Sequence, residues 1–260
     1  MLVHVIADYG QGDLAYAEVH QRLALHLPGA DVVYTPVPPF DTVSAGFCLA
    51  QLALTPGPAG RLIYVNVAPR QDDHQPRPGN AGERLLVGRA PGDVLVVAVD
   101  AGHALSFVRD EVADWHEAAL PPTGSQFRSR DAFPPLLPRL IAGDQQLRAT
   151  PVAAGEIPDP PDRAIAYVDG YGNLKTTWAS APAGVGTRVQ VRIGAATAEA
   201  VVGGGTFEVH AGELSFAPGS SGWRRRDGTE RPCFELLQRG GSAAERFGFP
   251  QPGAAVEIRT

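Results

Sequence analysis

Acidic side chains follow several short apolar runs in the first half of the sequence. Asp8 follows LVHVIA and Asp100 follows VLVVAV, while LIYVNV leads into NVAPRQDDHQPR (66–77), which combines arginines, aspartates and a histidine. Carboxylates accept charge-assisted bonds from hydroxyl and ammonium groups, and a carboxylate beside histidine and arginine can activate water. Residues 66–77 therefore fit either the edge of an active site or a solvated turn.

Structural roles compete with the chemical ones at most of these positions. Asp13 and Asp41 stand where helix N-caps are expected, and His103 fits an ordinary histidine after a turn. Asp8 closes an apolar strand, and a buried carboxylate needs hydrogen-bond partners. The sequence has no Walker, CxxC, HxxxH or GxSxG pattern, so zinc, P-loop and hydrolase-elbow chemistry are not expected, and no metal site is predicted.

Alternating apolar runs and helical patterns are expected to position these side chains. Strands are predicted at 2–7, 30–37, 61–67 and 93–100, and helices at 13–26, 41–54, 104–115 and 132–142. This alternation predicts an α/β N-terminal domain over 1–154, with a mostly parallel sheet and helices on both faces. In such a sheet, ligands bind at the carboxyl ends of the strands.

The pattern changes near residue 155. GEIPDPPD (155–162) has the composition of a linker, and RVQVRI (188–193) then opens a series of short alternating strands separated by glycine-rich turns. Residues 163–260 are predicted to form an all-β antiparallel barrel or sandwich domain.

Composition narrows the classes of partner. The net charge of −6 argues against nucleic acid or an anionic membrane surface, and no apolar run reaches the roughly 20 residues of a membrane helix. The first residues are expected to form a strand instead of a signal peptide. Cys48 and Cys233 stand among apolar neighbours, which favours buried free thiols and a cytoplasmic location.

Six segments in order resemble the S-adenosylmethionine (SAM) hydroxide adenosyltransferases, the family that also contains the SAM-dependent fluorinases and chlorinases. The resemblance runs over nearly the whole chain and rests on the combination of motifs, since none is decisive alone. The segments are ADYGQGD (7–13), PPFD (38–41), VAVDAG (97–102), FRSRDAF (127–133), VDGYGN (168–173), and SSG (220–222) with the stretch at 239–249.

The resemblance implies a SAM-binding protein that cleaves SAM at C5′ with water, giving adenosine and methionine, with no further cofactor. It also implies a homotrimer that binds SAM between the N-terminal domain of one subunit and the C-terminal domain of another. By motif position, Asp8 would hold the ribose hydroxyls and Asn173 the adenine edge, while Asp13 and Asp169 would take the methionine ammonium. The remaining ligand-binding positions that the motifs imply are Phe40, Ala68, Asp100 and Ser221.

The chain departs from this family where the family's water-using members resemble one another in an Asp–Arg–His set. Ala68 stands at the Asp position, Gln75 near the Arg position, and Arg128 at the His position. Three interpretations remain open. Asp72 or Asp73 with His74, Arg70 or Arg77, and Arg128 would form a rewired catalytic set. Alternatively, the protein transfers the adenosyl group to another nucleophile such as halide, or binds SAM or adenosine without turnover as a sensor or scaffold.

Overall fold

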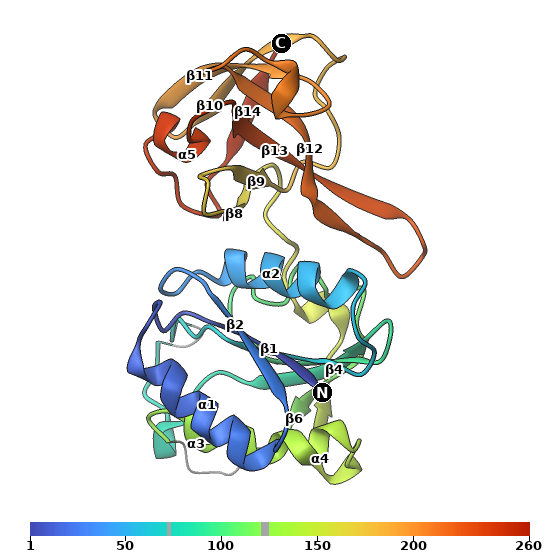
Figure 1. Cartoon of the computed structure of the whole chain (residues 1–260). Helices are drawn as coiled ribbons and strands as arrows, with labels where there is room; N and C mark the ends of the chain where they lie inside the picture. Colours follow the sequence, from blue (N-terminus) through green and yellow to red (C-terminus); the bar gives the residue numbers. More distant parts are fainter. Residues whose placement is uncertain (72–73, 121–124) are drawn as a thin grey trace. The chain divides into compact units, whose positions relative to one another are not determined.

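Two compact units make up the chain, Met1–Asp159 and Pro160–Thr260. The computed structural model describes residues 1–71, 74–120 and 125–260 (Figure 1). Each unit is built on one seven-stranded sheet. The division between the units falls inside the segment 155–162, where the sequence predicts a linker.

The sheet of the first unit is mixed, with the strand order β2-β1-β3-β5-β4-β6-β7. Four neighbouring strands run parallel, and β4, β6 and β7 pair antiparallel. The parallel strands are β1 (Leu2–Ala7), β2 (Asp31–Pro36), β3 (Leu62–Asn66) and β5 (Val94–Val99); the others are β4 (Leu85–Ala90), β6 (Ala113–Ala118) and β7 (Arg148–Pro151).

Two long helices cover this sheet. Figure 1 shows α1 (Leu14–His26) and α2 (Thr42–Leu54) on opposite sides of it. Both N-cap predictions are confirmed, because Asp13 accepts a hydrogen bond from the backbone of Ala15 at 2.8 Å, and Asp41 one from Ser44 at 2.9 Å. Two further helices, α3 (Arg128–Asp131) and α4 (Leu137–Ile141), have only four and five residues.

The prediction of an α/β domain with a mostly parallel sheet and helices on both faces is wrong, because three of the six strand pairings are antiparallel and each side of the sheet carries one long helix, not a layer of helices. The structure is mostly β, with two mixed sheets and few helices. One reason is β4, which the sequence did not predict and which pairs antiparallel with β5 through a tight turn at 91–93. Gly92 (φ 75°) and Asp93 (φ 59°) take left-handed conformations there, as hairpin turns require.

Both later helix predictions also fail. At 104–112 the backbone makes successive turns closed by bonds between residues three apart, such as Val108 N–H to Leu105 O at 3.1 Å, and the chain then enters β6. At 132–142 the helix is broken into a 3₁₀ turn, Pro134–Leu136, followed by the short α4. Prolines cause the break, since they lack the N–H that a helix interior needs.

The sheet of the second unit curls into a half-barrel with the order β14-β10-β11-β12-β13-β9-β8. Its strict antiparallel character was predicted wrongly, because β11 and β12 pair parallel. Alternation in β10 is confirmed, with every second side chain buried. The elements are β8 (Ile165–Val168), β9 (Leu174–Thr176), β10 (Arg188–Ile193), β11 (Ala196–Val202), β12 (Leu214–Arg224), β13 (Glu230–Gln238), β14 (Val256–Arg259) and a short helix, α5 (Ala243–Arg246).

Within the described residues, none of the helices combines the length and the apolar character needed to cross a bilayer. Cys48 and Cys233 are both buried, and neither forms a disulfide.

Candidate functional site

A pocket of about 660 Å³ opens in the first unit where two parallel strands end. Asp8 follows β1 and Asn66 ends β3, and both line it, so the pocket lies at the carboxyl ends of neighbouring strands, where open sheets bind ligands. Its volume is in the range of small-molecule sites. Seven of the positions singled out from the sequence line this pocket: Asp8, Phe40, Ala68, Arg70, Gln75, Arg77 and Arg128.

Asp8 presents a carboxylate to the pocket. Its Oδ2 accepts a hydrogen bond of 2.8 Å from the backbone N–H of Phe40, and its own backbone N–H contributes another. Burial raises the pKa of Asp8, while these two backbone bonds act in the opposite direction. Among the described residues no side chain donates a hydrogen bond to this carboxylate, so it keeps acceptor capacity for a ligand.

Strained backbone gathers around the pocket. Phe40 (φ 62°), Arg70 (φ 61°) and Asn80 (φ 54°) line it in the left-handed conformation, which costs energy for residues other than glycine. Such strain collects at functional sites because the surrounding structure must hold it in place.

Aromatic side chains supply an apolar part of the lining. Phe40 is 59% exposed although it is a large apolar residue. Tyr9 and Phe127 meet edge to face, with ring centroids 5.7 Å apart. Exposed and edge-packed rings offer a planar base a surface on which to stack.

Glu83 is a site residue that the sequence did not single out. It lines the pocket and is only 4% exposed. Its Oε1 accepts a hydrogen bond of 2.7 Å from the backbone of Arg70, and its Oε2 lies 3.8 Å from the nearest Arg128 nitrogen. Glu83 precedes a strand that was not predicted, and no motif marks it. The structure alone joins it to residues 66–77.

Arg128 is held firmly at the pocket wall. Its Nη2 donates to the backbone oxygen of Glu83 at 2.8 Å, and its guanidinium lies 5.1 Å from the centre of the Phe133 ring. Gly82 makes room for it, because a Cβ at that position would stand 2.6 Å from the guanidinium carbon. An arginine thus occupies the position at which the resembled family carries histidine.

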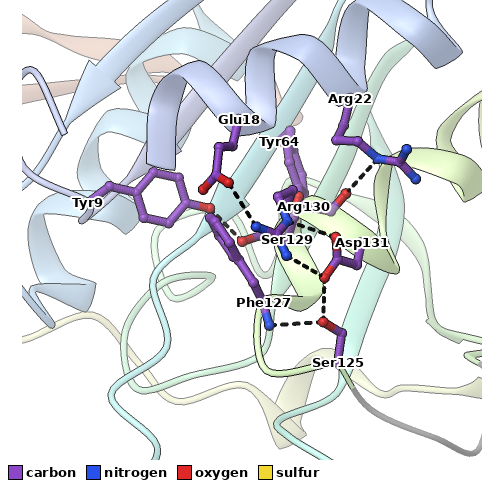
Figure 2. A network of polar contacts seen from close by, with 9 residues as sticks. All are labelled: Tyr9, Glu18, Arg22, Tyr64, Ser125, Phe127, Ser129, Arg130 and Asp131. Carbon is purple, nitrogen blue, oxygen red and sulfur yellow. Dashed lines mark hydrogen bonds and ion pairs between the residues drawn. The ribbon is translucent and has the colours of Figure 1, made fainter. Parts of the chain in front are cut away.

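A network of polar contacts holds α3 in place and includes residues of the pocket lining (Figure 2). Arg130 binds Asp131 through two nitrogens at 2.7 and 3.0 Å and reaches Glu18 of α1 at 2.9 Å. Arg130 and the hydroxyl of Ser125 lower the pKa of Asp131 to about 2. The hydroxyl of Tyr9 donates to Ser129 Oγ at 2.6 Å. The network ties Tyr9, at the end of β1, to the segment that carries Arg128.

Several predicted residues do not line the pocket. Asp13 caps α1, and Asp100 forms an ion pair with Arg84 at 2.6 Å. His74 is exposed and is not part of the lining. Asp72 and its neighbour Asp73 lie outside the described residues. Of the proposed rewired set, Arg77 and Arg128 therefore meet at the pocket with Arg70 and without His74.

In the second unit, the predicted residues Asp169 and Asn173 form a tight turn. Asp169 accepts bonds from the backbone of Tyr171 and Asn173 and from Asn173 Nδ2, at 2.9 to 3.0 Å. Lys175 lies beside this turn, 3.7 Å from Asp169 Oδ2 and 2.8 Å from the buried Glu235. The backbone of Ser221 donates to the same glutamate at 3.4 Å. Asp169 and Ser221 therefore lie beside a buried ion pair, and Asn173 is bonded to Asp169.

No three histidine, cysteine, aspartate or glutamate side chains in the described part of the chain are grouped to hold a metal ion.

Two solved structures resemble the whole chain. An uncharacterized conserved protein from Thermotoga maritima has a TM-score of 0.76 and 22% identity, over 99% of this chain and 100% of that one. A conserved hypothetical protein from Thermus thermophilus has a TM-score of 0.69 and 24% identity, over 99% of each chain. No protein-family model and no curated protein matches the chain. At these identities the likeness establishes the fold alone.

Proposed function

We propose that the pocket of the first unit binds SAM and that the protein transfers its adenosyl group to water, giving adenosine and methionine. The observation that carries the proposal is the Asp8 carboxylate, which lines the pocket, is oriented by the backbone of Phe40, and receives no side-chain hydrogen bond among the described residues. A carboxylate of this kind suits a pair of ribose hydroxyls, since both can donate to it.

The rest of the lining supports a nucleoside. Phe40, Tyr9 and Phe127 offer aromatic surface to the purine, and the pocket volume suits a molecule of this size. The resemblance in six ordered motifs selects SAM from among adenosine compounds.

The charges of the lining suit cleavage of a sulfonium. Three arginines, Arg70, Arg77 and Arg128, line the pocket with only Asp8 and Glu83 as carboxylates among the described residues. SAM loses its positive charge when the C5′–S bond breaks. A cationic environment therefore disfavours the bound sulfonium more than the transition state in which that charge is disappearing. Holding water in line with C5′ would supply the remainder of the rate.

The family resemblance also leads us to include an oligomer in the proposal. We propose a homotrimer in which Asp169, Asn173 and Ser221 of one subunit complete the site on another. Sedimentation of the purified chain tests this assembly, and a stable monomer contradicts it.

A second candidate is adenosyl transfer to an anion such as halide. The three arginines of the lining favour it, because they bring positive charge to the pocket. A third candidate, binding without turnover in a sensor or scaffold, rests on the loss of the family's Asp–Arg–His identities.

One assay separates these candidates. The purified protein is incubated with SAM in ¹⁸O-water, with and without chloride or fluoride, and the nucleosides are analysed by chromatography and mass spectrometry. Labelled adenosine supports transfer to water, and a 5′-halogenated nucleoside supports transfer to halide. Methylthioadenosine marks only the spontaneous breakdown of SAM. If SAM raises the melting temperature and no enzymatic product forms, the protein is a binder; if SAM neither binds nor reacts, the proposal fails.

A further inference from the structure

Glu83 holds a position that no motif assigns. It stands between the two chain segments in which the resembled family carries its catalytic residues. Its Oε1 accepts from the backbone of Arg70, and its backbone oxygen accepts from Arg128. Glu83 thereby joins residues 66–77, through its carboxylate, to the segment at 127–133, through its backbone oxygen.

The two carboxylate oxygens of Glu83 differ in their partners. Oε1 is occupied by the Arg70 N–H at 2.7 Å, whereas Oε2 has its nearest cation, Arg128, at 3.8 Å, beyond hydrogen-bond length. Among the described residues no donor lies within hydrogen-bond distance of Oε2, and Glu83 lines the pocket. One oxygen therefore anchors the side chain while the other remains available to accept a proton.

We propose that Glu83 is the catalytic base of this chain, a role that rests on the proposed transfer of the adenosyl group to water. Oε2 accepts a hydrogen bond from the water that attacks C5′, and Arg128 orients the carboxylate. The new bond joins the water oxygen to C5′, and the C5′–S bond breaks with its electron pair going to sulfur. One water proton moves to Glu83 and then to solvent, so SAM and water give adenosine, methionine with a neutral thioether sulfur, and a proton.

In this assignment, Glu83 supplies the carboxylate that the resembled family carries as an aspartate at the position of Ala68. At the position where the family carries aspartate this chain has Ala68, a small side chain in the same pocket lining as Glu83. A glutamate is longer than an aspartate by one methylene group. The proposed site therefore still contains a carboxylate and a guanidinium, which Glu83 and Arg128 supply from other positions of the chain.

If the role of Glu83 is purely structural, a different effect of the Glu83→Gln substitution is expected. If Glu83 only anchors the Arg70 backbone, glutamine suffices, because its amide oxygen accepts the same hydrogen bond. If Glu83 accepts a proton during the reaction, glutamine fails, since an amide is not a base at neutral pH. Glu83→Gln therefore separates the two roles in one substitution.

The experiment compares the intact protein with Glu83→Gln, Glu83→Asp and Glu83→Ala, and with Glu111→Gln as a control on a buried glutamate outside the pocket lining. We expect kcat for adenosine formation to fall about 100-fold or more in Glu83→Gln while the Kd for SAM and the melting temperature change little. Glu83→Asp is expected to retain part of the rate, and added formate to restore part of it in Glu83→Ala.

Each result bears on a separate claim. Full activity in Glu83→Gln overturns the assignment of Glu83 and leaves adenosyl transfer to water intact. An intact protein that binds SAM and forms no adenosine contradicts the proposed function and with it the role of Glu83. If Glu83→Gln fails to fold, the rate of Glu83→Asp and the formate response of Glu83→Ala decide, and the absence of both overturns the assignment.

Discussion

The backbone N–H of Phe40 donates to Asp8 Oδ2 at 2.8 Å, which links the residue before the α2 cap to the carboxylate at the end of β1. Phe40 makes this bond from a left-handed conformation. The carboxylate is partly buried in this position, and burial disfavours its charged form and so raises its pKa. Stability and ligand binding should therefore respond in opposite directions when this charge is removed.

Asp8→Asn should weaken SAM binding and stabilise the ligand-free fold. The amide oxygen still accepts from Phe40, but loss of a charge-assisted bond to the ribose costs about 1.5–3 kcal/mol, or roughly 10- to 100-fold in Kd. Titration calorimetry measures the affinity. Asp31→Asn, on an exposed residue outside the pocket lining, is the matched control. Unchanged affinity in Asp8→Asn would remove Asp8 from the site.

The pH dependence follows from the direction of the Asp8 shift. Between the ordinary value of 3.8 and the raised pKa, the folded protein binds more protons at this site than the unfolded chain. The contribution of Asp8 to stability therefore decreases as pH rises through that interval. Melting curves should show Asp8→Asn gaining stability over the intact protein above the interval and not below it. Affinity for SAM should fall as pH drops through the raised pKa.

Gly82→Ala should impair the pocket without unfolding the protein. The added Cβ would stand 2.6 Å from the Arg128 guanidinium carbon, and the flexible arginine must move. Because Arg128 then loses its contact with Glu83, we expect kcat to fall about 10-fold or more with a small change in melting temperature. Gly155→Ala serves as the control, since a Cβ there meets no atom within 4 Å. Equal rates in the two variants would contradict a role for the position of Arg128.

The sequence predicts most of the structure that depends on local pattern. Both caps, the strands at 2–7 and 93–100, and the alternation in β10 follow from residue types over a few positions. The wrong fold class comes from pairing, because the 91–93 turn joins β5 in an antiparallel hairpin to β4, a strand that the sequence did not predict. Sequence periodicity describes a few neighbouring residues and does not identify which strands pair.

In the site too, the sequence pattern identifies residues at strand ends but not residues whose role depends on contacts with distant parts of the chain. Asp8 and Phe40 could be placed at the pocket because they follow the ends of apolar runs. Glu83 could not, since its importance comes from contacts with Arg70 and Arg128, which are 13 and 45 positions away. His74 was considered because of its neighbours in sequence, yet its side chain is exposed and outside the lining. Proximity in sequence was a poor guide within 66–77.

Asp131→Asn should lower the melting temperature at neutral pH by a small amount, on the order of 2 °C, because Asp131 is partly exposed. Its pKa is lowered to about 2, chiefly by Arg130. The stabilisation is present above the ordinary value of 3.8 and is lost as pH falls through about 2. The difference between variant and intact protein should close over that interval. A difference independent of pH would show that the charge is not its source.

Lys175 is the only lysine in the chain, and it forms a buried ion pair with Glu235 at 2.8 Å, with side chains 10% and 3% exposed. Lys175→Met should destabilise the second unit strongly, by about 3–5 kcal/mol, because it leaves the Glu235 carboxylate buried without its cation. Lys175→Met with Glu235→Met should recover most of this loss, since neither charge then remains to be desolvated. Denaturant unfolding of the three proteins measures both effects.

Arg188→Met provides the control for that cycle, since Arg188 pairs with Glu199 on the exposed surface of the same unit. Exposed pairs contribute little, so its unfolding midpoint should stay close to that of the intact protein.

The Lys175 and Glu235 variants also test ligand binding, because Lys175 lies 3.7 Å from Asp169 Oδ2. If the lysine competes with the methionine ammonium for that carboxylate, the double variant should bind SAM more tightly than the intact protein. Weaker binding would instead show that the ion pair positions Asp169 and Ser221 for the ligand.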